Sequence, residues 1–305
     1  MMTVPLCAET IYANLCEQVQ QQFVMPNAIE VLEKTSSTQQ YLKEKLKKNA
    51  NVTLDKNAGK TKGALAKEKD QSQFIVKPMS RNFNLVVAES QSAGVGRSNR
   101  SWQASSESNV LMSFSWEYEC IPKDLAGLSL ALVLGLLESL KAKFSLSFSI
   151  KWPNDLLLSG KKIAGLIVDM ESAKSCKVIV GLGLNVCQDL GDTVIDQDWT
   201  DLAKEGVIIN DRNELIAAIL EGFYAVIHDY SKVGFRGYQE KWNAHAEHRG
   251  KKVKLFMRSS NLKTSLEPEV VGVLHGVNEQ GFLLVKTQEG MRTITDANYS
   301  MRLYT

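Results

Sequence analysis

The fold is decided by the stretch FSIKWPNDLLLSGKKIAGLIV, residues 148–168. Residues 148–152 have the pattern of a strand, and Pro153 holds the residue before it extended and fixes a tight corner. Two apolar runs, 156–158 and 163–168, then flank a Ser-Gly pair that suits a hairpin turn. The stretch therefore predicts three strands in close succession, with polar residues projecting from the corner between the first two.

The sequence on both sides of this stretch predicts an α+β domain followed by a smaller β domain. A short buried strand is expected at 85–88, a half-buried strand at 110–116 and a central strand at 178–184. After Trp242 the chain alternates short strands with turns, which predicts a small all-β domain near the C-terminus. Helices are expected at 9–24, from Ser37 or Thr38 through Leu46, at 124–143 and from Asp211 onward.

Composition and charge are those of an ordinary globular protein. The 305 residues are 44% hydrophobic and carry a formal net charge of +2, which excludes extended disorder and gives no overall reason to expect a nucleic-acid binder. The charge is uneven, because residues 43–77 hold ten lysines and four acids and so carry +6. We interpret 49–82 as a solvated, flexible insertion; a contact surface for an acidic partner is the alternative.

The five cysteines indicate a reducing compartment. They are scattered, with no C-x-x-C, and match neither a zinc site nor a disulfide framework. No signal peptide is visible, and the most apolar run, 125–140, contains polar residues and is short for a membrane span. We therefore expect a cytoplasmic protein that makes no contact with a membrane.

Two motifs suggest anion binding. The loop 89–102, called the lid loop below, combines glycines with Arg97 and Arg100, a pattern suited to a phosphate or carboxylate, although such loops are often plain surface turns. At the corner after Pro153, Asp155 could hold a hydrated Mg²⁺ and Asn154 could bind phosphate or ribose, or both could simply serve the turn.

Two further motifs concern the strands after that corner. Lys161 and Lys162 alternate faces, so one can point inward and stabilise negative charge, or both can be a solvated hairpin pair. Gly181 and Gly183 interrupt an apolar strand, which suggests close approach of a ligand or tight packing of a helix. By contrast, His245 and His248 lack a third metal ligand and are expected to be a surface pair.

In this order, the motifs resemble those of the biotin–protein ligases, also called biotin–[acetyl-CoA carboxylase] ligases. The resemblance covers about residues 29–305. It rests on Ser-Ser-Thr-Gln-Gln (36–40), Gln-x-Ala-Gly-x-Gly-Arg (91–97), Lys-Trp-Pro-Asn-Asp (151–155), Lys-Ile-Ala-Gly (162–165) and Gly-x-Gly-Leu-Asn (181–185).

The resemblance implies a mixed-sheet catalytic domain of the biotinyl/lipoyl ligase type, related to class II tRNA synthetases, and a C-terminal SH3-like β-barrel. It divides the chain into an N-terminal helical extension (1–28), a catalytic biotin- and ATP-binding domain (29–248) that contains the insertion 49–82, and the β domain (249–305). Only about 28 residues precede the matching region, so we expect no winged-helix domain and no binding of operator DNA.

The implied activity is ATP-dependent biotinylation of a lysine on a biotin carboxyl carrier domain of acetyl-CoA carboxylase, through biotinyl-5′-AMP. Biotin and ATP with Mg²⁺ are the implied substrates, with no tightly bound cofactor. By motif position, the catalytic residues are Lys162, Arg97 and Arg100, and Asp155 is a candidate Mg²⁺ ligand. The implied biotin-binding residues are Ser37, Thr38, Gln39, Gln91, Gly94, Val95, Gly96, Arg97, Lys162, Gly165 and Gly183. Those implied for ATP are Arg100, Trp102, Asn154, Asp155, Lys162 and Asn185, with Trp102 as the adenine stack.

The lid loop departs from the family's Gly-Arg-Gly-Arg-x-Gly-Arg pattern at two positions, since Val95 replaces an arginine and Asn99 replaces a glycine. Loss of one cation predicts weaker retention of the adenylate. The alternatives to a biotin ligase are a lipoate or octanoate ligase of the same fold and a non-catalytic, biotin-responsive regulator. Family members can dimerise through sheet edges, and the sequence leaves a homodimer open.

Overall fold

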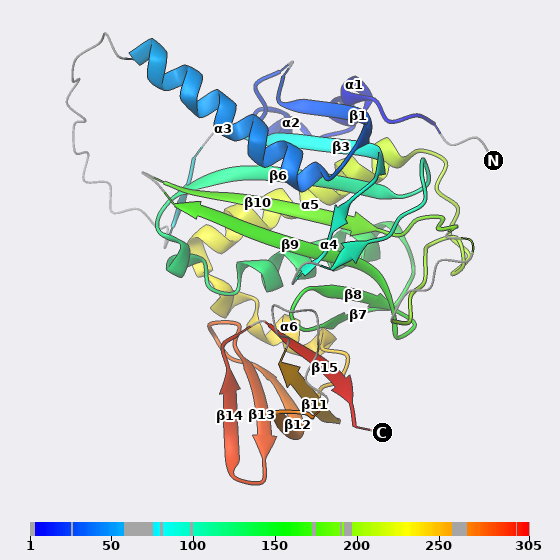
Figure 1. Cartoon of the computed structure of the whole chain (residues 1–305), viewed down its shortest axis with the longest axis vertical. Helices are drawn as coiled ribbons and strands as arrows, with labels where there is room; N and C mark the ends of the chain where they lie inside the picture. The colour runs from blue at the N-terminus through cyan, green and yellow to red at the C-terminus, as the bar shows by residue number, and fades with distance from the viewer. Residues whose placement is uncertain are drawn as a thin grey trace.

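A computed structural model describes residues 4–25, 27–57, 76–79, 82–97, 100–172, 175–189, 191, 197–257, 267–296 and 298–304. Its larger part is a mixed sheet with helices on both faces, and its smaller part is a second sheet at the C-terminal end (Figure 1). Asn99 of the lid loop lies outside the described residues, and so do residues 58–75 and 80–81 of the predicted insertion. The predicted fold class, a mixed-sheet domain with a small C-terminal β domain, is confirmed.

The main sheet has the strand order β1-β3-β6-β10-β9-β8-β7, with β2 paired to β6. The pair β1–β3 is parallel and the other pairs are antiparallel. The strands are β1 (Ile29–Thr35), β2 (Lys77–Pro78), β3 (Asn84–Gln91), β6 (Val110–Glu119), β7 (Phe148–Lys151), β8 (Asp155–Leu158), β9 (Lys161–Ser172) and β10 (Cys176–Leu184).

Residues 148–168 form three adjacent strands, as predicted. Strands β7 and β8 are joined by a corner in which the Trp152–Pro153 peptide bond is cis. The β8–β9 turn uses Ser159 and Gly160, both with positive φ (52° and 73°), which is the geometry of a two-residue hairpin turn.

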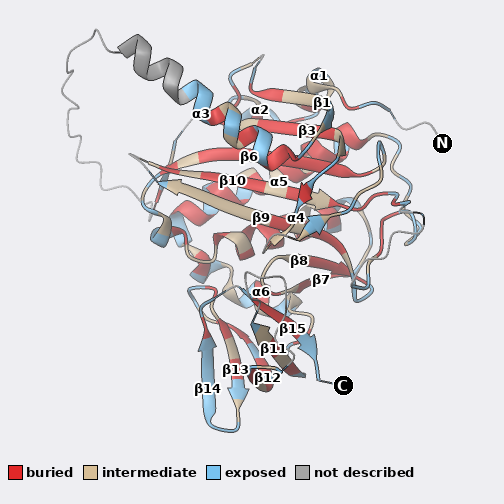
Figure 2. Ribbon diagram, viewed as in Figure 1, coloured by how far each residue is buried: buried red, intermediate tan, exposed pale blue. Residues whose placement is uncertain are grey.

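One face of the sheet is covered by α4 (Leu128–Lys143) and α5 (Arg212–Val233), which pack against each other behind it (Figure 1). Figure 2 shows both helices largely buried. Within the described residues, Pro122–Lys143 is the one helical segment apolar and long enough to cross a membrane, and 61% of its apolar window is buried inside the protein. Helix α4 is buried between the main sheet and α5, which explains why it is apolar on most sides.

Three helix predictions need correction. The predicted helix 9–24 is two short helices, α1 (Ala8–Ala13) and α2 (Glu17–Gln20), because the chain becomes extended at Cys16 (ψ 155°). The predicted helix 124–143 begins as a 3₁₀ turn (Pro122–Leu125) and restarts after Gly127, whose φ of 82° interrupts it.

The third correction concerns the predicted insertion. Helix α3 (Thr38–Asn57) starts where predicted, and the Ser37 hydroxyl accepts a hydrogen bond from the Gln40 amide, 3.4 Å away, at its N-terminus. It continues to Asn57, so residues 49–57 are helical rather than irregular. This helix lies across the opposite face of the sheet from α4 and α5 (Figure 1).

The C-terminal sheet has five antiparallel strands in the order β14-β13-β12-β11-β15. They are β11 (Lys252–Met257), β12 (Val270–Val277), β13 (Leu283–Thr287), β14 (Gly290–Ile294) and β15 (Tyr299–Leu303). Helix α6 (Gln239–His245) links the two parts through Asn243, whose side chain bonds both the amide and the carbonyl of Val277, at 2.8 and 3.1 Å. The small β domain predicted after Trp242 is therefore present.

Candidate active site

A cavity of about 500 Å³ opens on the α3 side of the main sheet. Its wall comes from the start of α3, the lid loop, the β7–β8 corner and the ends of β9 and β10, and β15 of the C-terminal sheet closes one side. Within the lid loop, β4 (Gly94–Val95) pairs with β5 (Ser101–Trp102) and carries the loop over the cavity. Motifs that are far apart in the sequence thus surround one space.

Glycines form the floor of this cavity. Gly183 of β10 pairs in register with Gly165 of β9. A Cβ on Gly183 would lie inside the Trp102 ring, 2.5 Å from Cζ2, and one on Gly165 would lie 3.1 Å from Cε of Lys162. A Cβ on Gly181 would be 2.7 Å from Oε1 of Gln39. These three positions are glycine because Trp102, Lys162 and Gln39 rest directly on the sheet.

One end of the cavity, called the head end below, is a network of uncharged hydrogen-bonding groups. Oε1 of Gln91 accepts from the amide and the hydroxyl of Thr38, at 2.7 and 3.2 Å. The Ser113 hydroxyl lies 2.9 Å from Oγ1 of Thr38 and 3.1 Å from Oε1 of Gln39. Ser37, Thr38, Gln39 and Ser113 are all less than 9% exposed. Such a cluster suits a small polar ring with both donors and acceptors.

The opposite end is cationic. Nζ of Lys162 lies 2.8 Å from Oδ1 of Asp155, with 16% and 21% of the two side chains exposed. Nη1 of Arg97 donates to Oδ1 of Asn154 at 3.3 Å, and the Asn154 amide donates to the Leu166 carbonyl. Burial lowers the pKa of the Arg97 guanidinium, and the Asp155 carboxylate opposes that shift. An arginine stays charged at neutral pH despite such a shift, so this end presents fixed positive charge.

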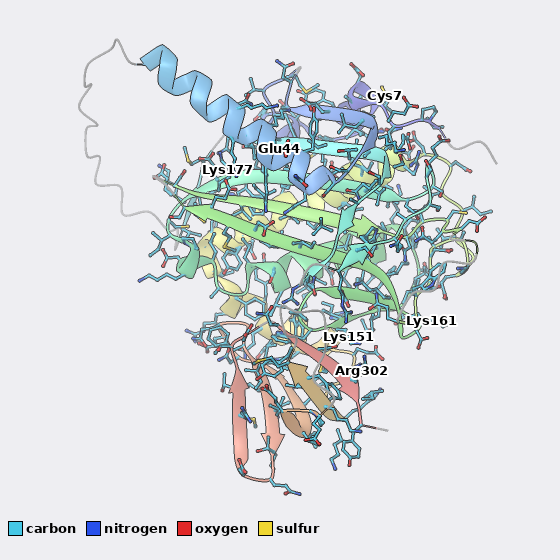
Figure 3. All side chains as sticks on the ribbon, viewed as in Figure 1. Cys7, Glu44, Lys151, Lys161, Lys177 and Arg302 are labelled. Carbon is cyan, nitrogen blue, oxygen red and sulfur yellow. The ribbon has the colours of Figure 1, made fainter. Side chains whose placement is uncertain are left out.

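The backbone of Lys162 is also held in place. Its amide donates to the Asp198 carbonyl at 3.0 Å, and its carbonyl accepts from the Thr200 amide at 2.9 Å. The Asn185 side chain donates to the Thr200 carbonyl at 3.0 Å, which fastens the same segment from the far side. As predicted for the lysine pair, Lys162 faces the cavity, whereas Lys161 is exposed at the outer edge of the hairpin (Figure 3).

The structure brings nearly all the predicted residues together. Ser37, Thr38, Gln39, Gln91, Val95, Gly96, Arg97, Arg100, Trp102, Asn154, Asp155, Lys162, Gly165, Gly183 and Asn185 all line the cavity. Gly94 is the exception: it is buried in the β4–β5 hairpin, and a Cβ there would lie 2.7 Å from the Trp102 carbonyl oxygen. Its role is therefore to let the hairpin close, not to line the site.

Sequence reasoning missed several lining residues. The strand predicted as half-buried, β6, is buried on both faces, and Ser113 lies in the cavity with no exposed surface. Its alternation with apolar neighbours was visible, but the covering α3 and lid loop were not. Lys151 and Arg302 also line the cavity, one from each domain (Figure 3), and no local sequence pattern encodes that arrangement.

His248 was expected at the surface and is instead 9% exposed at the cavity wall. Its Nδ1 atom is buried without a hydrogen-bond partner among the described residues. Burial is the main cause that lowers the pKa of this imidazole below 6.5, and the nearby Lys151 adds to the shift. His248 is therefore a neutral side chain at the junction of the two domains.

The described residues contain no group of three or more His, Cys, Asp or Glu side chains that could hold a metal ion. Mg²⁺ commonly binds through one or two carboxylates together with substrate phosphates. Asp155, the carboxylate beside Lys162, fits that arrangement as a single protein ligand and would need phosphate oxygens to complete the shell.

The chain is similar in sequence to known ligases. The Biotin/lipoate A/B protein ligase family matches residues 66–185. The bifunctional ligase/repressor BirA of Bacillus subtilis is 30% identical over 71% of this chain and 66% of its own length, and that of Escherichia coli is 28% identical over 69% and 64%. The biotin–[acetyl-CoA-carboxylase] ligase of Mycobacterium tuberculosis is 29% identical over 69% of this chain and 75% of its own.

Among solved structures, the biotin protein ligase from Aquifex aeolicus in complex with biotin and ATP matches with a TM-score of 0.66 and 25% identity, over 92% of this chain and all of that one. This chain spans less than two thirds of the E. coli relative. Sequence motifs, fold and cavity lead to one conclusion: the chain carries a domain of the biotin/lipoate A/B protein ligase family, with biotin protein ligases as its relatives and structural neighbours.

Proposed function

We propose that this protein activates biotin with ATP and transfers the biotinyl group to a lysine of a biotin carboxyl carrier domain, that of acetyl-CoA carboxylase being the expected acceptor. The observation that carries the proposal is the polarity of the cavity. Its head end offers uncharged donors and acceptors, its other end offers Lys162 and Arg97, and a glycine floor joins them. A ligand with a polar ring, an aliphatic chain and a carboxylate fits this order.

In the first step, a carboxylate oxygen of biotin attacks the α-phosphorus of ATP. A new P–O bond forms, the bond to pyrophosphate breaks, and biotinyl-5′-AMP results. Negative charge builds on the phosphoryl oxygens, where Lys162 and Arg97 stabilise it without having to reorganise. Arg100 adds a further cation to the same wall. When Mg²⁺ is bound at Asp155 with the phosphates, it supplies additional charge neutralisation.

In the second step, the amine of the carrier lysine attacks the acyl carbon, a C–N bond forms, AMP leaves with the C–O bond electrons, and the amine loses a proton. Closure of the lid loop over the adenylate would keep water away from the mixed anhydride. Trp102, flat on Gly183 and Gly165, would supply the ring for the adenine, and Asn185 would hold the 197–200 segment against the nucleotide.

The head end favours biotin over lipoate or octanoate. A cyclic urea can add hydrogen bonds to Thr38, Gln39 and Ser113 beyond those they make with one another, whereas a dithiolane or an alkyl chain offers them no polar partner. The intact cationic end likewise favours an enzyme over a non-catalytic regulator. The cytoplasmic location, a homodimer and the lack of operator binding stay predictions.

The test is biotin- and ATP-dependent labelling of a purified carrier domain, with pyrophosphate release measured in parallel. Wild-type protein should label one lysine. Lys162→Ala should lose pyrophosphate release while it still binds biotin. Labelling with lipoate in place of biotin, or Lys162→Ala at the wild-type rate, would contradict the proposal.

A further inference from the structure

Asp169 lies on β9 just outside the cavity and holds a residue of the head end. It pairs in register with Ile179 of β10. One of its carboxylate oxygens, Oδ2, accepts from Nε2 of Gln39 at 2.8 Å and from Nζ of Lys43 at 2.7 Å. Both partners come from α3, one helical turn apart, so the carboxylate clamps the start of that helix to the sheet.

This clamp fixes which way the Gln39 amide faces. Nε2 of Gln39 donates to Asp169 and also to the Ile179 carbonyl, at 3.2 Å. A carboxylate and a carbonyl only accept hydrogen bonds, so a flipped amide would set its oxygen against two acceptors. Oε1 of Gln39 must therefore face Ser113, over Gly181 and the cavity floor.

The direction of the whole head-end network follows from that one orientation. Oε1 of Gln39 accepts from Ser113 and retains a second lone pair. At the other end of the network, Oε1 of Gln91 is occupied by two donors from Thr38. The part of the network nearest Asp169 thus presents an acceptor, which a ligand can meet only with an N–H or O–H donor.

We propose that Asp169 is a positioning residue that sets the polarity of the head end, so that Oε1 of Gln39 selects a ligand ring with an N–H donor. Lys43 balances the charge of the carboxylate and keeps it in place. The inference rests on the proposed function, because the cyclic urea of biotin carries such N–H groups. It extends that function by naming a residue outside the cavity that controls recognition of the ring.

The test compares Asp169→Ala and Asp169→Asn with Glu171→Gln, a matched change two residues further along the same strand. KM for biotin and for ATP is measured in the pyrophosphate-release assay, and the biotin Kd is measured without ATP by calorimetry. Asp169→Ala should raise the biotin KM and Kd about tenfold, since a hydrogen bond to a charged group is lost. KM for ATP and kcat should stay within about twofold. Asp169→Asn should show a smaller effect, because its side-chain oxygen can still accept from Gln39, and Glu171→Gln should match wild type.

A double-mutant cycle separates positioning from a general structural role. In a Gln39→Ala background, Asp169→Ala should add little further loss of biotin affinity, since there is no amide left to orient. Additive losses, equal rises in both KM values or an unchanged biotin Kd in Asp169→Ala would overturn the inference. Wild-type protein that binds biotin but releases no pyrophosphate would refute the proposed function while the Kd comparison still decides the role of Asp169. Wild-type protein that binds no biotin would overturn both.

Discussion

Nζ of Lys162 lies 2.8 Å from Oδ1 of Asp155, and this ion pair joins two motifs on the two arms of one hairpin. Asp155 pairs in register with Gly165, while a bulge between Leu156 and Leu157 shifts the pairing so that Lys162 lies opposite Leu157. A bulge re-aims side chains, and here it accompanies a lysine that reaches back to the carboxylate beside the cavity. The ion pair holds the Lys162 ammonium in place, and this is the group proposed to stabilise negative charge in the transition state.

Asp155→Asn should therefore slow the adenylation step. The neutral amide keeps the shape but no longer anchors the ammonium, and loss of a partly buried charge-assisted contact of this kind corresponds to about a tenfold to hundredfold lower rate. Biotin affinity without ATP should change little, because the head end is untouched. Single-turnover pyrophosphate release checks the rate, and Lys161→Ala, whose side chain lies outside the cavity, should retain it. A wild-type rate in Asp155→Asn would show that Lys162 does not need this anchor.

Gly183→Ala should block the cavity floor. The added methyl group would overlap the Trp102 ring, so the indole must leave the sheet. Because Trp102 is a half-buried residue of the lid loop and not part of the main core, we expect a small loss of stability and a weakening of ligand binding by at least about tenfold. Calorimetry with biotin and with ATP measures the binding. If the clash is the cause, Gly183→Ala combined with Trp102→Ala should bind biotin better than Gly183→Ala alone.

His248 should make stability depend on pH. Its imidazole has a pKa below the 6.5 of an unfolded chain, mainly because of burial. Between these two values the unfolded chain binds more protons than the folded one, so stability is fully present above pH 6.5 and is lost as pH falls toward the folded pKa. The loss is about 1.4 kcal/mol for each unit by which the pKa is lowered.

The measurement is the melting temperature of wild type and His248→Gln at pH 7.5 and 5.5. Wild type should lose more between the two values than the variant does. Comparing the two proteins removes the part of the pH dependence that does not involve His248. Equal losses would mean that His248 is protonated as readily in the folded protein as in the unfolded chain.

The features that the sequence predicted depend on short-range interactions along the chain, and those that it missed depend on contacts between distant segments. The corner before Asp155 and the hairpin that carries Lys162 are local patterns, and each has its expected structure. The glycines of β10 lie in the predicted strand, where the Trp102 and Gln39 side chains rest on them. The lining by Arg302 depends on how one domain rests on the other, which is not encoded in any short stretch.

The head end was predicted only in part for a similar reason. Gln39 carries a motif, but the residue that orients it, Asp169, comes from a strand 130 positions away and looks like an ordinary surface acid in sequence. Burial of Ser113 likewise depends on α3 folding over β6. A hairpin and its turn can be predicted from sequence, whereas contacts between distant elements need the structure.

Val95→Arg should strengthen retention of the adenylate. Val95 stands where the resembling family has an arginine, and it lines the cavity from the lid loop with 47% of its surface exposed. Because almost half of its surface is exposed, an arginine there displaces little packing. One added charge-assisted contact to the phosphate of biotinyl-AMP corresponds to dissociation slower by about tenfold or more. The assay loads the enzyme with biotin and ATP, removes the excess and follows release of biotinyl-AMP. Val95→Gln, which adds length without charge, should release the adenylate near the wild-type rate. If Val95→Arg also leaves that rate unchanged, the missing lid cation does not govern retention of the intermediate.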